Sequence, residues 1–236
     1  MFQFKQFAVD DSGCAMKVGT DGVLLGCWTE IGNACNIVDA GCGSGLISLM
    51  MAQRTADARI YAVDIDEDAA RCCQSNADSS PWGERIEVVR SDITVSFPEV
   101  SSPLLIVSNP PFFNEPLKSP DSHRALARHG ESFGIESLIE ISSRQLQTRD
   151  DSLAFISPSG RKDEIEWLLS CGRLAPKHVT TVYSKAGKGA LRILWQVVAE
   201  RFLDSPCETD NLYIRNEANE YTADYQQLTF PFYLDK

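Results

Sequence analysis

Short apolar segments alternate with amphipathic segments from residue 36 to residue 171. The apolar segments have the length and composition of buried strands, and they cover residues 36–40, 59–65, 85–89, 104–108 and 152–157. The segments between them are typical of helices and cover residues 44–54, 66–77, 135–147 and 161–171. Strands that alternate with helices indicate βαβ units and a mostly parallel sheet.

The last part of the chain follows a different pattern. Two apolar segments, 178–184 and 191–200, are joined only by the glycine-containing loop KAGKGA, which is typical of an antiparallel hairpin. We expect a single domain over residues 1–236. Its parts are an N-terminal cover (1–35), a core of strands and helices (36–200) and a C-terminal strand with a short helix (201–236).

Length and composition are those of an ordinary globular protein. The 236 residues are 43% apolar, which is enough to bury a sizeable core. No apolar run is long enough to cross a membrane, and the first residues lack the pattern of a secretory signal. The eight cysteines form no C-x-x-C pair and have no histidine at zinc-finger spacing. We therefore expect a cytoplasmic protein with reduced thiols and no bound metal.

The net charge of −11 argues against a polyanionic partner, but the charge is uneven. Residues 167–199 contain no Asp or Glu, and their basic residues are Arg173, Lys177, Lys185, Lys188 and Arg192. A second basic cluster lies farther upstream and consists of Lys118, His123, Arg124, Arg128 and His129. A solvated face is one explanation for each cluster, and a surface for a polyanion is the other.

A glycine-rich stretch, DAGCGSG, follows the first predicted strand. Gly41, Gly43 and Gly45 allow a tight turn and a close approach of a ligand to the backbone, and the next helix offers free N–H groups. The spacing differs from the G-x-G-x-x-G of dinucleotide sites. Asp39, two residues before the first glycine, suits a ligand with an ammonium or sulfonium cation. A purely structural turn is the alternative.

Acidic residues also follow the next two strands. Asp64 lies 25 residues after Asp39, where a carboxylate can accept both hydroxyls of a ribose, and Ile65 follows it. Asp66 suits a helix N-cap equally well. Asp92 can accept the amino group of an adenine, although a turn is an alternative role for it. Together with the glycine loop, these residues indicate a site for S-adenosylmethionine rather than NAD.

The fourth predicted strand runs directly into Asn109, Pro110, Pro111 and Phe112. An exocyclic amine on a base is a poor nucleophile, because its lone pair is delocalised into the ring. Hydrogen bonds to the Asn109 side-chain oxygen and the Pro110 carbonyl would draw the amine toward tetrahedral geometry, so that its lone pair points at the methyl group. Pro111 would stiffen this corner. Phe112 would stack on the base, which is worth about 1–3 kcal/mol, and Phe113 would stack or join the core.

These motifs resemble those of class I methyltransferases. The resemblance implies a Rossmann-like α/β fold with seven mostly parallel strands, an antiparallel last strand and helices on both faces. The signature (D/N/S)-P-P-(Y/F/W) is similar to that of amino methyltransferases, whose acceptors include adenine N6, guanine N2, cytosine N4 and protein glutamine. The glutamine enzymes carry a separate helical domain before the glycine loop, and only 38 residues precede Asp39 here.

The flanking segments resemble the bacterial tRNA1(Val) adenine-37 N6-methyltransferase family over nearly the whole chain. The segments that carry the resemblance are FKQFAV, CAMKVGTDGVLLGCW, LMMAQRT, SPWGERI, SNPPFF and YTADYQQLTFPFYL. The resemblance implies methylation of N6 of the adenosine that follows the anticodon of a tRNA. Guanine-N2 methylation of RNA is the alternative, and protein glutamine methylation a weaker one. The family commonly has Tyr at positions 112 and 113 and Glu at position 64, so a hydroxyl contact is lost here while stacking is kept.

The resemblance also implies roles for residues outside the motifs. Thr20 and Asp21 would close over the cofactor, and an N-capped helix start at either of them is compatible with that role. The basic residues Arg124, Arg128, Lys185, Lys188 and Arg192 would hold the tRNA backbone on either side of a flipped base. Two alternative functions belong to other classes of protein. One is a non-catalytic cofactor-binding module, which the intact Asn109 and Phe112 disfavour, and the other is an NAD-dependent oxidoreductase.

Overall fold

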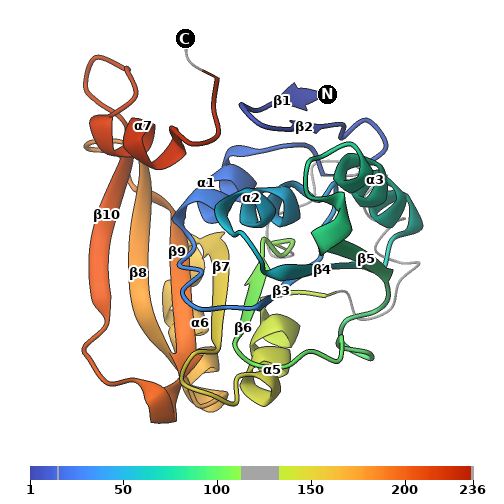
Figure 1. Cartoon of the computed structure of the whole chain (residues 1–236). Helices are drawn as coiled ribbons and strands as arrows, with labels where there is room; N and C mark the ends of the chain where they lie inside the picture. Colours follow the sequence, from blue (N-terminus) through green and yellow to red (C-terminus); the bar gives the residue numbers. More distant parts are fainter. Residues whose placement is uncertain (15, 113–132, 235–236) are drawn as a thin grey trace, which may run out of the picture.

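The computed structural model describes residues 1–14, 16–112 and 133–234. Its centre is an eight-stranded sheet with the order β10-β8-β9-β7-β6-β3-β4-β5 (Figure 1). The strands are β3 (Asn36–Ala40), β4 (Arg59–Asp64), β5 (Ile86–Arg90), β6 (Leu104–Ser108), β7 (Ser152–Pro158), β8 (Leu174–Lys185), β9 (Ala190–Ala199) and β10 (Glu208–Arg215). All neighbouring strands pair in parallel except β9, which is antiparallel to both β7 and β8.

Helices cover both faces of the sheet. The α-helices are α1 (Thr20–Trp28), α2 (Leu46–Arg54), α3 (Glu67–Asp78), α5 (Ile135–Gln145), α6 (Lys162–Cys171) and α7 (Ala223–Thr229). Short 3-10 helices are η1 (Gly83–Arg85), η2 (Ser159–Arg161) and η3 (Glu200–Phe202). Alternate strand residues face opposite sides, so Leu105 joins the core beneath α1 and α2, whereas Ile106 joins the core beneath α5 and α6.

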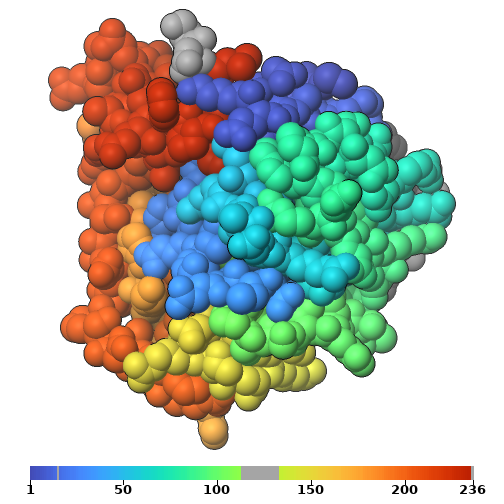
Figure 2. All heavy atoms as spheres, in the orientation of Figure 1, coloured from blue at the N-terminus to red at the C-terminus, as the bar shows by residue number. Residues whose placement is uncertain are grey.

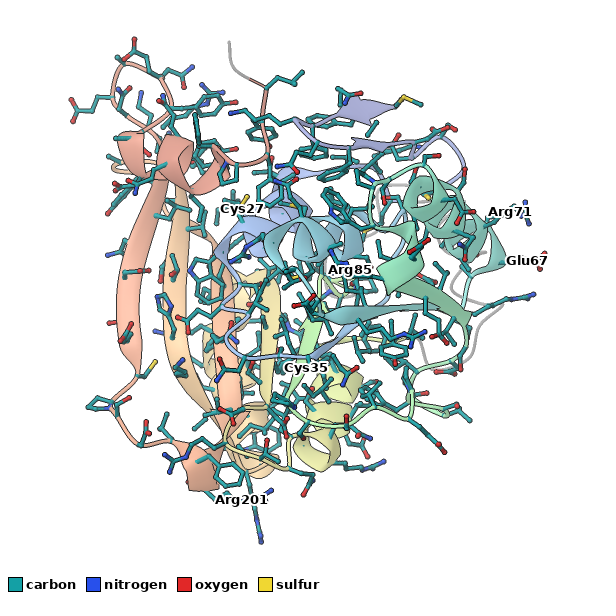
Figure 3. All side chains as sticks on the ribbon, viewed as in Figure 1. Cys27, Cys35, Glu67, Arg71, Arg85 and Arg201 are labelled. Carbon is teal, nitrogen blue, oxygen red and sulfur yellow. The ribbon has the colours of Figure 1, made fainter. Side chains whose placement is uncertain are left out.

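Local sequence explains the central elements. Every residue of β6 is buried, as expected for a parallel strand covered on both faces. Helix α3 begins where Asp66 accepts a hydrogen bond from the Ala69 N–H at 2.8 Å, and its first turn carries Glu67 and Asp68. Asp66 is therefore an N-cap. The Arg85 guanidinium points into the body of the protein and donates to the carbonyls of Ala52, Thr55 and Ala58 (Figure 3).

The two ends of the chain lie together. Strands β1 (Phe2–Gln3) and β2 (Ala8–Val9) form a small separate sheet beside the C-terminal segment, at the top of the molecule (Figures 1 and 2). The Lys5 N–H donates to the Phe232 carbonyl at 2.8 Å, and the Phe4 ring stacks on Tyr233. No helix in the described part of the chain is long and apolar enough to cross a membrane.

The expected fold class is confirmed, with one difference in the sheet. We expected seven strands, but β10 adds an eighth by pairing in parallel with β8 from Glu208 opposite His178 to Arg215 opposite Lys185. The added strand is mostly exposed and lacks the apolar alternation that marks the others. It covers the backbone edge of β8, which would otherwise remain unpaired along much of its length.

Candidate cofactor and acceptor site

The carboxyl ends of three adjacent parallel strands bring the predicted residues together. Strand β3 lies between β4 and β6, with Ala40 opposite Val63 and Asp39 opposite Val107. The glycine loop, Asp64 and Asn109 therefore lie together at the carboxyl edge of the sheet, next to the point between β3 and β6 where the strand order reverses. The Ser108 hydroxyl donates to the Ala40 carbonyl at 2.6 Å and fixes the ends of β3 and β6 against each other.

The glycine loop turns through three residues with positive φ. The values are +75° at Gly41, +54° at Gly43 and +79° at Gly45, a region that other residues avoid. The N–H groups of Gly41 and Cys42 donate to the Val63 carbonyl at 2.9 and 3.0 Å. The loop is thus held against the end of β4 before it enters α2.

Two glycines of this loop differ in what a methyl group would meet. An added Cβ at Gly45 would lie 2.6 Å from the Cys73 Sγ, whereas at Gly43 nothing lies within 4 Å. We expect Gly45→Ala to lower the free energy of unfolding by about 2 kcal/mol or more, through strain and steric overlap. Gly43→Ala should cost only the backbone strain, about 1–2 kcal/mol. Urea denaturation of both variants measures the difference, and equal losses would contradict it.

Asp39 is fully buried beneath the loop. Its Oδ2 accepts hydrogen bonds from the Ser48 N–H at 3.0 Å and the Ser48 hydroxyl at 2.6 Å, while its Oδ1 has no hydrogen-bond partner among the described residues. Burial raises the pKa of Asp39 to about 7, against the opposing hydrogen bonds from Ser48. A buried carboxylate oxygen without a partner is costly, and a bound cation would compensate for it.

Asp64 lies at the carboxyl edge of the sheet and also holds the glycine loop in place through hydrogen bonds. Its Oδ2 accepts from the Gly43 N–H and its Oδ1 from the Asp66 N–H, both at 2.9 Å. Burial raises the pKa of this carboxyl, while these backbone hydrogen bonds oppose the rise. Each ionised oxygen has a second acceptor site, so hydrogen bonds from ribose hydroxyls remain possible.

The next strand end completes the cofactor side of the site. The Ser91 N–H donates to the Asp64 carbonyl at 3.0 Å, which brings Asp92 beside Asp64. One oxygen of Asp92 accepts from both the N–H and the hydroxyl of Thr94, so this residue also forms a turn. Ile65 is 43% exposed, an unusual exposure for an isoleucine directly after a central strand. An apolar side chain between two carboxylates suits the face of an adenine.

The Asn-Pro-Pro-Phe corner presents one free amide. Asn109 is half-buried, and no hydrogen bond joins its side chain to another described residue. Pro110 is buried, and Pro111 is half-buried. Phe112 packs against the cores on both sides of the sheet, which holds its ring at the corner. Phe113 lies outside the described residues.

Helix α1 contributes an ion pair that the sequence pattern does not reveal. Its N-cap is Gly19, without a side-chain hydrogen bond, so neither Thr20 nor Asp21 caps the start of this helix. Thr20 is exposed at the first turn. Asp21 instead accepts a hydrogen bond from the Arg192 Nε at 2.8 Å, and the Arg192 guanidinium lies 5.2 Å from the centre of the Phe112 ring.

A second aromatic residue at the site was missed from the sequence. A Cβ added at Gly41 would approach the Phe133 ring to 3.4 Å, so this ring covers the glycine loop. Phe133 directly precedes Gly134, the N-cap of α5. Its only sequence signal is an aromatic residue just before a predicted helix.

The predicted tRNA-binding residues are dispersed. Lys188 is exposed in the turn between β8 and β9, and the Lys185 Nζ donates to the Glu217 carbonyl at 2.7 Å. Arg192 lies within the site itself, paired with Asp21. Arg124 and Arg128 lie outside the described residues. Within the described ranges, no cluster of three His, Cys, Asp or Glu side chains is arranged to hold a metal ion.

The residues at this edge fit S-adenosylmethionine. The buried carboxyl of Asp39 supplies negative charge beneath the loop that suits its ammonium group, Asp64 suits its ribose, and Ile65 with Asp92 suits its adenine. The open space over Gly43 leaves the backbone free for close approach.

Comparisons with known proteins agree with this arrangement. The sequence model of the Methyltransferase small domain family matches residues 16–133. A tRNA1(Val) (adenine(37)-N6)-methyltransferase from Aeromonas hydrophila is 43% identical over 99% of this chain and 97% of its own length. The enzyme of that name from Phocaeicola vulgatus is 42% identical, with the same coverage.

Solved structures show the same fold at low sequence identity. A predicted O-methyltransferase from Agrobacterium tumefaciens superposes with a TM-score of 0.66 at 19% identity, over 90% of this chain and 96% of its own. A putative class I S-adenosylmethionine-dependent methyltransferase from Listeria monocytogenes gives 0.58 at 16% identity, over 89% of this chain and 66% of its own. S-adenosylmethionine is thus the cofactor that both the site and the family imply. With relatives this similar over its full length, the chain belongs to the tRNA1(Val) (adenine(37)-N6)-methyltransferase family.

Proposed function

We propose that this protein transfers a methyl group from S-adenosylmethionine to N6 of adenine 37 in tRNA1(Val), forming N6-methyladenosine. The observation that carries the proposal is the free, half-buried amide of Asn109 beside the glycine loop, in an Asn-Pro-Pro-Phe corner. The names of the full-length relatives support the same acceptor. We infer further that residues 1–236 act as one catalytic domain, that the partner of this protein is tRNA, and that the protein works in the cytoplasm, where tRNA is found.

The acceptor side of the site works by positioning. When bound, S-adenosylmethionine supplies a methyl group on a positively charged sulfur. The Asn109 side-chain oxygen and the Pro110 carbonyl accept hydrogen bonds from the adenine amine, so its lone pair leaves the plane of the ring. Phe112 stacks on the flipped base, and its packing against both cores keeps the ring in place. The methylated amine releases its proton readily, so no strong base is required.

The cofactor side of the site is expected to respond to pH through Asp39. Because the pKa of Asp39 is raised to about 7, the carboxyl is mostly protonated at pH 6 and mostly ionised at pH 8. An ammonium-bearing ligand favours the ionised form. We therefore expect affinity for S-adenosylhomocysteine to rise about tenfold between pH 6 and pH 8, and calorimetric titration measures it.

Asp39→Asn serves as the matched variant for this prediction. The amide can still accept from Ser48, but it cannot ionise, so its affinity for S-adenosylhomocysteine should be low and independent of pH. Stability should respond in the opposite direction. Because the pKa of Asp39 is higher in the folded than in the unfolded protein, the free energy of unfolding falls as the pH rises from the unfolded-state pKa toward 7. Asparagine at this position cannot ionise, so the Asp39→Asn variant should not show this fall. A flat affinity profile in the unaltered protein would remove Asp39 from the cofactor site.

The proposed activity is tested with labelled S-adenosylmethionine and unmodified bulk tRNA, followed by mass spectrometry of the nucleosides. Labelled N6-methyladenosine is the expected product. Labelled N2-methylguanosine would keep the mechanism but assign the enzyme to guanine. No labelled nucleoside, with S-adenosylhomocysteine shown to bind, would reject an RNA substrate.

A further inference from the structure

One face of the β8–β10 ladder combines aromatic, basic and neutral polar side chains and contains no carboxylate. Paired residues of the two strands share a face, and the register places on this face Thr181, Tyr183, Lys185, Thr209, Asn211, Tyr213 and Arg215. The opposite face carries His178 with Glu208 and Asp210, and it packs against α1, where the Trp28 Nε1 donates to the Thr180 hydroxyl at 2.8 Å. In a chain with 33 acidic residues, the absence of acids from one face is notable.

The carboxyl half of this face is open to solvent. Val179, nearer the start of β8, is buried in the core with α6, but farther along Asn211 is exposed and Tyr213 is 37% exposed. The rings of Tyr183 and Tyr213 are stacked at 4.9 Å with an angle of 19° between their planes. A pair of tyrosines at this exposure offers a flat platform for an unstacked base.

The cations of this face are not neutralised by carboxylates. Lys185 and Arg215 are direct partners in the register, and like charges in such positions repel each other. Their hydrogen bonds go to the carbonyls of Glu217 and Asn219, both at 2.7 Å, and neither has an ion pair within the described part of the chain. Arg215 also lies 4.3 Å from the centre of the Tyr221 ring.

Many other surface arginines are paired with carboxylates, although Arg173 and Arg201 also have no ion pair among the described residues. Arg71 pairs with Glu67 on the outer side of α3, where both side chains point into solvent (Figure 3). The arginines at positions 59, 90, 144, 149 and 161 are also paired with carboxylates. The end of β8 and β10 therefore brings together Lys185, Lys188 and Arg215, three cations without an ion pair among the described residues, and together they can attract phosphate groups.

The location connects this face with the catalytic corner. Strand β8 is antiparallel to β9, which is antiparallel to β7, so β8 and β10 run in the same direction as β6. Lys185 and Arg215 therefore lie at the same edge as Asn109. They are separated from β6 by three or four strand spacings, or about 15–20 Å, and Figure 1 shows β10 and β8 at the outer end of the sheet.

We propose that Tyr183, Lys185, Lys188, Tyr213 and Arg215 form a second RNA-contact surface, the β8–β10 surface. It binds the sugar–phosphate backbone and an unpaired base of the RNA substrate while a different nucleotide occupies the Asn109 corner. Lys188 joins it from the exposed β8–β9 turn. This inference depends on the proposed RNA substrate. It adds Tyr213 and Arg215 of β10, which neither the Asn-Pro-Pro-Phe motif nor the basic residues of the β8–β9 hairpin indicate.

The test uses the full chain with substitutions on this surface. Lys185→Gln/Arg215→Gln should raise the Kd for the tRNA substrate about tenfold, and lower the slope of log Kd against log salt by about 1.4–1.8, as expected for two lost phosphate contacts. Tyr213→Ser should raise the Kd about tenfold without changing that slope. The kcat at saturating tRNA and the affinity for S-adenosylhomocysteine should stay within twofold of the unaltered protein.

Arg59→Gln is the matched control. It removes one exposed positive charge at the amino-terminal edge of the sheet, where Arg59 pairs with Glu87 at 3.7 Å among the described residues. If the surface variants bind tRNA as Arg59→Gln does, with unchanged salt slope, the β8–β10 surface is rejected while the proposed function stands. If the unaltered protein fails to methylate the tRNA, the proposed function itself fails. Thermal melting confirms folding, and the glutamine pair tests the surface even if Tyr213→Ser is unstable.

Discussion

Asn109→Ala should lower kcat by about 100- to 1,000-fold while the affinity for S-adenosylhomocysteine changes by less than about twofold. In the proposed mechanism the side-chain oxygen of Asn109 acts on the acceptor amine, so its loss should affect the transition state more than cofactor binding. The proposed cofactor contacts come from residues that follow β3, β4 and β5, and the substitution leaves the pairing of these strands intact. Single-turnover methylation of the tRNA and calorimetry with S-adenosylhomocysteine measure the two effects separately.

Two further variants make this prediction specific. Asn109→Asp keeps an oxygen acceptor at the same position and should lose less activity than the alanine variant. Asn33→Ala removes an exposed amide on the opposite edge of the sheet and should be indistinguishable from the unaltered protein. A loss of less than fivefold in Asn109→Ala would contradict the role assigned to this side chain.

Arg192→Met should lower kcat/KM by about 2- to 30-fold without changing the salt dependence of tRNA binding. The guanidinium is already neutralised by Asp21, so it contributes little to phosphate contacts. Its main effect is on Phe112, over whose ring it lies, and a cation in such a position is worth about 0.5–2 kcal/mol. Loss of Arg192 also leaves Asp21, which is only 25% exposed, without its partner.

A double-substitution cycle separates these two contributions. Asp21→Asn/Arg192→Met removes both charges, so its free energy of unfolding should recover part of what Arg192→Met loses. Activity should stay low, because the contact with Phe112 is still missing. Arg192→Lys keeps the charge but not the planar group and should recover only part of the activity. If Arg192→Met instead lowered the slope of log Kd for tRNA against log salt, as expected for Lys185→Gln/Arg215→Gln, Arg192 would be a phosphate ligand.

Most of the fold could be predicted from the sequence because its central strands are buried on both faces. Apolar segments such as 104–108 are continuous, and turn-forming residues, which are glycines, acids, asparagine or prolines, follow the central strands. Parallel topology then brings the residues after each strand to one edge, so Asp39, Asp64 and Asn109 could be grouped before any contact was known. This geometry follows from strand direction alone.

The remaining features depend on contacts between distant residues, which leave no periodic signal. Asp21 and Arg192 are 171 positions apart, and nothing in either segment indicates their pairing. Strand β10 has an exposed pattern, so its place in the sheet comes from the open edge of β8 rather than from its own sequence. The contact between Gly45 and Cys73 likewise depends on how α2 and α3 pack.

The most direct test of the central claim is methylation of two tRNA1(Val) transcripts, one unaltered and one with adenosine 37 replaced by guanosine. With labelled S-adenosylmethionine and purified protein, the unaltered transcript should incorporate close to one methyl group per molecule, recovered as N6-methyladenosine, and the substituted transcript should incorporate none. Equal incorporation into both transcripts, or label recovered in another nucleoside, would contradict the assignment of adenine 37 as the acceptor.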